Sequence, residues 1–147
     1  MQVTADKLAQ DLLALWMHMM RGGVSRSIAL LDGLGLGLHQ IKTLDTLHAR
    51  GDDPTVNELA ELLGLSLPGT SRNVDGLIRA GLVERREDER DRRMKRLRLT
   101  DAGRDAIKRV NAARLEGLEA FTDSLPPEQR EALSAALDPI VKGLLDR

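Results

Sequence analysis

The chain has 147 residues, of which 41% are hydrophobic and 31% are charged, and its formal net charge is −1. This length and composition suit one globular domain with a single core. Because the chain has no cysteine, disulfides, thiolate metal sites and thiol-based redox sensing are excluded. No stretch approaches the roughly 20 apolar residues of a membrane span, and the N-terminus is a poor match to a signal peptide. We therefore expect a cytoplasmic protein.

The small net charge hides a segregation of charge along the chain. Residues 66–98 include ten Lys or Arg and six acidic residues, a net of +4, whereas the rest of the chain carries 12 basic and 17 acidic residues, a net of −5. A basic segment on an acidic body is what a phosphate-contacting face requires. A solvated charged turn would give the same count, so the surrounding pattern has to decide.

Apolar residues at helical spacing predict three helices in the first third of the chain. They cover residues 4–21, 24–34 and 38–49, with Thr4 placed to cap the first one. Gly37 takes the cap position of the third helix, where glycine is an acceptable substitute for serine or threonine.

Two shorter helices follow, and they have the features of a helix-turn-helix motif. Asn57 is placed to cap the first, and Ser66 opens the second, which runs to about residue 80. Ala60 is small where two helices cross closely, and Gly64 allows a positive φ in the turn.

A helix that enters the major groove presents short polar and basic groups early and apolar groups later, as the second helix does. Its candidate DNA-contacting residues are Ser66, Thr70, Ser71, Arg72 and Asn73. Two roles stay open for Asn73. It could pair with adenine, or it could lie half-buried and hydrogen-bonded, which we favour.

Alternation of apolar and charged residues predicts strands at 82–85 and 96–99, joined by a highly charged loop. The wing candidates for DNA contact are Arg90, Arg92, Arg93 and Arg96, since a narrow loop tip can carry an arginine into the minor groove. Asp91 is expected to hold one arginine by a bidentate salt bridge and so to fix the loop. A long helix capped by Thr100 and a last helix over 128–145 complete the chain.

These segments resemble the MarR family of winged helix-turn-helix transcriptional regulators. GLVER at 81–85, DERDRR at 88–93 and LTDAG at 99–103 are similar to the family's G-L-V-x-R, D-x-R-D-R-R and L-T-x-x-G. The resemblance covers residues 35–103 well, and the flanking helices in layout only. It implies a mainly α fold with a small β-hairpin, as a single domain over 1–147. In that domain a winged helix-turn-helix lobe at 35–103 is flanked by dimerisation helices at 1–34 and 104–147.

The terminal helices carry more apolar surface than a small domain can cover. In the last helix Leu133, Leu137, Ile140 and Leu144 form a narrow seam, and the first helix is apolar over much of its circumference. Apolar patches of this size mark interfaces, although such helices could also cap the core of a monomer. The resemblance implies an intertwined homodimer with two recognition helices about one DNA turn apart.

Together these features predict a sequence-specific double-stranded DNA-binding transcriptional regulator, a ligand-responsive repressor that acts as a homodimer on a pseudo-palindromic operator. The alternative is a winged-helix protein–protein interaction module without DNA binding, which would not need an arginine-rich tip. The resemblance implies a small aromatic or phenolic effector, with Trp16, Met19, Met20 and His39 as candidate contacts.

Enzymatic functions find little support. The chain has no glycine-rich phosphate loop, and its three histidines, His18, His39 and His48, have no carboxylate motif at ligand spacing. We expect no catalytic activity, no metal and no cofactor.

Overall fold

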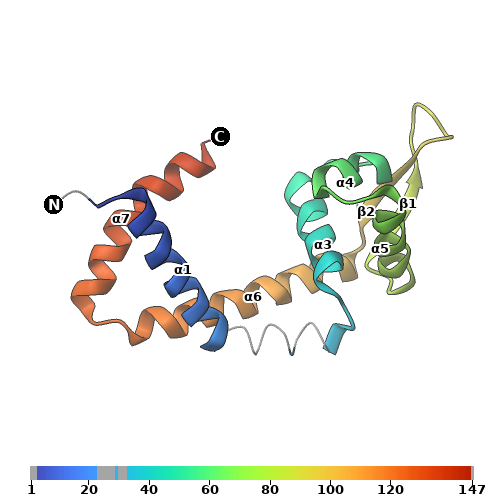
Figure 1. Cartoon of the computed structure of the whole chain (residues 1–147). Coiled ribbons are helices and arrows are strands. Elements are labelled where there is room, and N and C mark those ends of the chain that lie inside the picture. Colours follow the sequence, from blue (N-terminus) through green and yellow to red (C-terminus); the bar gives the residue numbers. More distant parts are fainter. Residues whose placement is uncertain (1–2, 23–28, 30–32, 147) are drawn as a thin grey trace. The chain divides into compact units, whose positions relative to one another are not determined.

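The computed structural model describes residues 3–22, 29 and 33–146 (Figure 1). Two compact units are found. The terminal unit comprises residues 1–27 and 114–147, and the central unit comprises residues 28–113. Most of the helix predicted at 24–34 lies outside the described residues.

The central unit contains α3 (Leu38–Arg50), α4 (Val56–Leu63), α5 (Leu67–Arg79), β1 (Val83–Glu87), β2 (Lys95–Leu99) and the first half of α6 (Asp101–Ser124). In Figure 1 the hairpin of β1 and β2 extends beyond the helices of this unit. The strands are antiparallel, and the pairs Arg86–Arg96 and Glu87–Lys95 make the ladder longer than the sequence predicted. The predicted mainly α fold with a small hairpin is confirmed.

Every helix and strand of the central unit contributes at least one apolar side chain to its core. Leu44, Leu59, Leu77, Leu97 and Ile107 come from α3, α4, α5, β2 and α6, and each is fully buried. Burying a leucine or isoleucine of this kind contributes about 1.5–3 kcal/mol. The hairpin and the helix-turn-helix therefore share one core and are held against each other.

The cap of helix α4 is Thr55 and not Asn57, two residues earlier than predicted. The Thr55 hydroxyl accepts a hydrogen bond from the Glu58 amide at 3.2 Å, and a Glu58 carboxylate oxygen accepts one from the Thr55 amide at 2.9 Å. This reciprocal pair is a capping box. The predicted caps at Gly37 and Ser66 are confirmed.

The start of α6 is fastened to the hairpin at a point where two backbones meet closely. The Thr100 hydroxyl donates to the Gly81 carbonyl at 2.6 Å and accepts from the Gly103 amide at 3.0 Å. A Cβ added to Gly103 would lie 2.0 Å from the carbonyl oxygen of Leu82. This approach requires glycine, which gives a packing reason for the last residue of the LTDAG segment.

The terminal unit contains α1 (Ala5–Gly22), the second half of α6 and α7 (Pro127–Leu145). The rings of His18 and Phe121 meet edge to face, with their centroids 6.2 Å apart. None of the described residues of this unit is buried. Its exposed large apolar side chains are Val3, Leu8, Leu12, Leu13, Trp16, Met17, Leu115, Leu118, Leu137, Ile140, Val141, Leu144 and Leu145.

Across the part of the chain that the structure describes, the helices are too short or too polar to pass through a lipid bilayer.

The close approach at Gly103 generates a stability prediction. Gly103→Ala should destabilise the protein by about 1–3 kcal/mol or more, because the backbone of Leu82 must move. Gly143→Ala is the matched control, since a Cβ at that helical position meets nothing within 4 Å. The control should be neutral or stabilising by up to about 1 kcal/mol. Urea unfolding of both variants measures the difference, and equal stabilities would contradict the packing argument.

Candidate nucleic-acid interface

The turn between α4 and α5 sets the position of the candidate recognition helix, α5. Gly64 ends α4 in the left-handed conformation, with φ 64° and ψ 32°. The Leu65 amide then donates to the Ala60 carbonyl at 3.1 Å, which gives a Schellman-type end. The Ser66 hydroxyl accepts from the Gly69 amide at 3.2 Å and starts α5 two residues after the turn. Ala60 is buried, as the helix-turn-helix interpretation requires.

The exposed face of α5 differs in part from the predicted one. Thr70 is fully buried, and its hydroxyl donates to the Ser66 carbonyl at 3.0 Å. The prediction that Thr70 contacts DNA is therefore wrong, because the side chain lies on the same buried stripe as Val74 and Leu77. Arg72 is exposed, and Ser71 is half-buried.

Asn73 fits the role we favour only in part, and its pairing with adenine stays a prediction. Its side chain is half-buried, as we favoured, but among the described residues it makes no hydrogen bond. It lines a small hollow beside α5 together with His39, Leu65, Ser66, Gly69 and Arg72. The amide group of Asn73 is thus available to a ligand in this hollow.

The candidate effector residues fall in different units. Trp16 is exposed and Met19 is half-buried on α1 of the terminal unit, and the side chain of Met20 lies outside what the structure describes. His39 lies on α3 of the central unit, in the hollow beside α5. Its neighbours there are the candidate DNA contacts Arg72 and Asn73.

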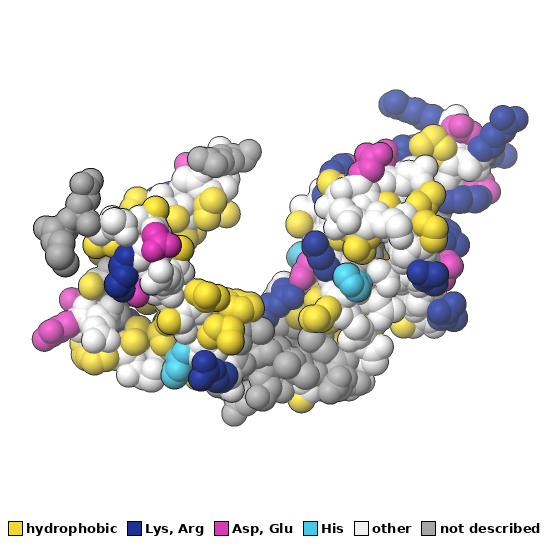
Figure 2. Space-filling view, in the orientation of Figure 1, with side chains coloured by type: hydrophobic (Ala, Val, Ile, Leu, Met, Phe, Trp, Pro, Cys, Tyr) yellow, Lys and Arg dark blue, Asp and Glu magenta, His cyan; other side chains and the backbone are white. Residues whose placement is uncertain are grey.

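The tip of the hairpin carries three arginines whose guanidinium groups have no partner among the described residues. Arg90, Arg92 and Arg93 are all exposed. Figure 2 shows dark blue side chains gathered at the far end of the hairpin. Three free cations on a narrow projection form a surface suited to phosphates or to the minor groove.

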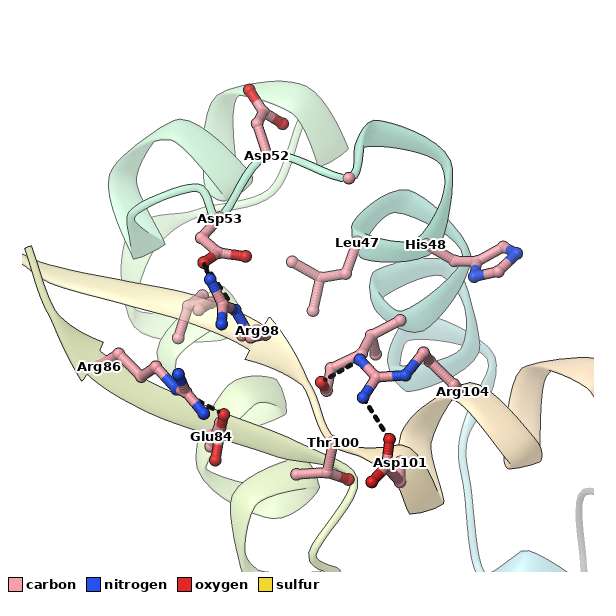
Figure 3. Close-up of a pocket in the computed structure, with 13 residues that line it drawn as sticks. Leu47, His48, Asp52, Asp53, Glu84, Arg86, Arg98, Thr100, Asp101 and Arg104 are labelled. Atoms are coloured by element: carbon pink, nitrogen blue, oxygen red, sulfur yellow. Dashed lines mark hydrogen bonds and ion pairs between the residues drawn. The ribbon is translucent and has the colours of Figure 1, made fainter.

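Most other basic residues of segment 66–98 are held in ion pairs. The pairs are Arg85 with Asp75 at 2.7 Å, Arg86 with Glu84 at 2.7 Å, Lys95 with Glu87 at 2.8 Å, and Arg98 with Asp53. Figure 3 shows a polar hollow lined by Arg86, Arg98 and Arg104, in which each arginine faces a carboxylate. Because these charges are already compensated, the hollow lacks the excess positive charge of a phosphate site.

The residue that shapes the wing is Asp88. One of its carboxylate oxygens accepts from the backbone amides of Arg90 at 2.8 Å and Asp91 at 3.0 Å. The other accepts from Arg96 Nε at 2.7 Å. Asp91, expected to hold an arginine by a salt bridge, instead accepts from the backbone amide of Arg93 at 3.0 Å. An aspartate does hold an arginine and fix the loop, as predicted, but this aspartate is Asp88 and not Asp91.

The contacts of Asp88 lower its pKa from 3.8 to about 2, with the Arg96 hydrogen bond as the largest cause and the two backbone amides next. A lowered pKa in the folded state means that the interaction stabilises the fold fully above about pH 4. This contribution is lost as the pH falls through about 2. The wing loop is accordingly fixed at neutral pH.

Arg96 was predicted to contact DNA, but in the structure its guanidinium group binds other residues of the chain. Besides Asp88, it donates to the Asp53 carbonyl at 3.2 Å and lies 3.4 Å from a carboxylate oxygen of Glu58. Glu58 belongs to the capping box of α4, so Arg96 connects the wing to the first helix of the helix-turn-helix. Because Nε and Nη1 of Arg96 are bound internally, this arginine positions the wing, and its contact with DNA stays a prediction.

Sequence reasoning missed several residues of this surface. Arg79 is exposed at the end of α5 and has no ion-pair partner among the described residues. Glu58 could have been found from the Thr-x-x-Glu signature of a capping box. Asp53 and Asp88 have no such local signal. Within the described residues, no group of three or more His, Cys, Asp or Glu side chains could hold a metal ion.

Helix α4, the tight turn, α5 and the anchored hairpin define a winged helix-turn-helix protein. Residues 34–94 match the model of the MarR family. Over these residues the chain is similar to this family, whose members are transcriptional regulators and not enzymes.

Three relatives illustrate the similarity. YfiV of Bacillus subtilis (strain 168), described as an uncharacterized HTH-type transcriptional regulator, is 28% identical over 111 residues, which are 76% of this chain and 69% of YfiV. RV1404 from Mycobacterium tuberculosis has a TM-score of 0.81 at 25% identity, over 97% of this chain and 95% of that one. The crystal structure of the S. aureus MepR–DNA complex has a TM-score of 0.73 at 25% identity, over 92% and 98%.

The Asp88 contacts predict an effect opposite to that of simple electrostatics. Asp88→Ala removes a negative charge from the wing, yet we expect about tenfold weaker binding to any duplex, because the loop must then be ordered on binding. Glu89→Ala is the matched control. It removes the same charge, but Glu89 makes no hydrogen bond or ion pair among the described residues, so affinity should stay unchanged or rise slightly.

Fluorescence anisotropy with labelled duplexes measures both affinities. If both variants bind more tightly, Asp88 does not shape the wing. A carboxyl NMR titration adds an independent readout, in which the pKa of Asp88 near 2 should move back toward 3.8 in Arg96→Gln.

Proposed function

We propose that this protein is a sequence-specific double-stranded DNA-binding regulator, which acts as a homodimer on a pseudo-palindromic operator and as a ligand-responsive repressor. One observation carries the proposal. The exposed Arg72 of α5 and the free arginines of the wing tip belong to a single unit in which wing and helix-turn-helix share a core.

Direct readout is assigned to α5. Arg72 lies in the second turn of this helix, and an arginine can pair with the O6 and N7 acceptors of guanine in the major groove. The helix is held at a fixed place by its Ser66 cap and by its buried side chains, so Arg72 is presented with little loss of entropy on binding.

Backbone and minor-groove contact is assigned to the wing. Arg90, Arg92 and Arg93 are on a hairpin tip that Asp88 holds in shape. The minor groove is narrow and has an enhanced negative potential in A·T-rich DNA, which attracts arginine. A protein–protein module would gain nothing from three unpaired guanidinium groups on a projecting loop, and the MepR–DNA complex supports the DNA-binding interpretation.

Dimerisation is assigned to the terminal unit. Its described residues include no buried side chain, although α7 alone exposes Leu137, Ile140, Val141 and Leu144. An unburied apolar surface of this size is typical of an interface. A second copy of the chain fits it, because a two-fold pair of recognition helices matches a pseudo-palindromic site.

Repression and its relief follow from the same arrangement. A dimer on an operator occludes the promoter, and an effector that alters the dimer alters the distance between the recognition helices. We propose a small aromatic or phenolic effector that contacts α1 at Trp16 and Met19. A regulator of this kind acts in the cytoplasm.

The dimer prediction has a single-residue test. Ile140→Asp should give a monomer that binds a full operator much more weakly, because a charge would be placed in the proposed apolar interface. Ala135→Asp, on the opposite side of the same helix and also exposed, is the control and should leave the dimer intact. Analytical ultracentrifugation at micromolar concentration decides the matter. A monomeric wild-type protein would end the proposal of a homodimer.

Recognition helix and wing should respond differently to substitution. Arg72→Ala should relax sequence preference at particular base pairs, by about 1–3 kcal/mol of discrimination. Arg90→Ala or Arg93→Ala should weaken binding to most duplexes evenly and lower the salt dependence by about one contact each. A dimer making roughly 6 to 10 phosphate contacts should lose about 10³ to 10⁵ in affinity between 50 and 200 mM salt.

A DNA selection from a random-sequence library, followed by anisotropy at several salt concentrations, measures these effects. A flat salt response with no enriched sequence would favour the protein-interaction module.

The effector prediction uses the single tryptophan of the chain, Trp16. Phenolic compounds that release the protein from its operator should also quench Trp16 fluorescence over the same concentration range. Compounds that leave the DNA complex intact are the control and should not quench. Release without any change at Trp16 would place the effector elsewhere.

A further inference from the structure

The first turn of the recognition helix has an unusual surface for a helix that reads DNA. Leu67 is 46% exposed, Pro68 is exposed, and Gly69 has no side chain. The Ser66 hydroxyl accepts a hydrogen bond from the Gly69 amide, and Thr70 is fully buried. The residues that would enter the groove first therefore present mainly apolar atoms.

The core of the protein does not account for this apolar surface. The buried side chains of α5 are Thr70, Val74 and Leu77. Leu67 lies one turn before Thr70, at the end of this stripe, where about half of its side chain stays in solvent. Pro68 suits the first turn of a helix because it lacks an amide hydrogen, but this preference does not require it to be flanked by an exposed leucine.

The polar contacts of α5 begin next to these two residues. Ser71 lies four positions after Leu67, and Arg72 lies four positions after Pro68, so each pair shares one side of the helix. A base read by Arg72 and a base touched by Leu67 or Pro68 are thus neighbours in the groove. In the major groove the only apolar group on a base edge is the 5-methyl group of thymine.

We propose that Leu67 and Pro68 form a thymine-reading surface, which selects a thymine methyl group beside the guanine read by Arg72 in each half-site. This inference rests on the proposed function and specifies it further. It assigns part of the preference for a DNA sequence to apolar contacts. The amino-acid sequence had suggested a polar contact by Thr70 instead.

The test replaces thymine by uracil, which removes the methyl group and leaves base pairing unchanged. The probe is a duplex that the wild-type protein selects from a random-sequence library, with deoxyuridine introduced at one thymine position at a time. Wild-type affinity should fall about fourfold at one position of a half-site, as expected for one methyl group in an apolar contact. Substitution in both half-sites should give about 16-fold.

Variants show whether Leu67 and Pro68 are responsible. In the Leu67→Ala, Pro68→Ala double variant, the thymine and uracil duplexes should bind within about 1.5-fold of each other. Leu62→Ala is the matched control, since Leu62 is 47% exposed on α4 but lies outside the recognition helix. It should keep the fourfold difference. Circular dichroism checks that all variants keep the helical content of the wild type.

Each outcome bears on the proposal. An enriched duplex with no uracil-sensitive position, or a sensitivity that persists in the double variant, overturns the thymine-reading surface and leaves the DNA-binding function standing. If no duplex is enriched over random DNA, sequence-specific binding itself fails, and this inference fails with it.

Discussion

The interaction on which the central unit depends is the set of contacts around the Arg96 guanidinium. It binds Asp88 of the wing loop, the Asp53 carbonyl and the capping-box carboxylate of Glu58. The Leu97 amide adds a backbone bond to the Pro54 carbonyl at 2.9 Å, which places the segment before α4 along β2. These contacts join the hairpin to residues 53–58, a segment far from it in sequence. They fix the orientation of the wing before DNA arrives, so less conformational entropy is lost on binding.

Anchoring the wing divides the basic residues of segment 66–98 into two groups with different tasks. Arg85, Arg86, Lys95, Arg96 and Arg98 neutralise carboxylates of the sheet and its neighbours. Arg72, Arg79, Arg90, Arg92 and Arg93 have no ion pair within this fully described segment and face solvent. The net charge of the segment understates the positive charge of the second group, because most acidic residues of the segment are paired with the first group. A modest overall charge is therefore compatible with a strongly cationic surface.

The sequence predicted those features that depend on neighbours within a few residues. The Ser66 cap, the Gly64 turn and the alternation in the hairpin are local, and all three were found. The prediction for Thr70 was wrong because its spacing to Val74 and Leu77 places this polar side chain on the buried stripe. The choice between Asp88 and Asp91 could not be made from sequence. It depends on which carboxylate the partner strand brings to Arg96, and that follows from the register of β1 and β2.

In the terminal unit, unlike the central one, local sequence patterns predict the helices but contacts within the chain leave them unburied. Its helices could be predicted from periodicity, yet no described side chain in it is buried. In the proposed homodimer the missing burial comes from the second chain, so these helices are stabilised largely by association. The distance between the two recognition helices then depends on a unit whose own packing is incomplete without its partner. Because few buried contacts within one chain hold this unit, its shape depends largely on its contacts with the partner. In this proposal, an effector near Trp16 alters the spacing of the recognition helices, while each central unit, with its own core and anchored wing, keeps its structure.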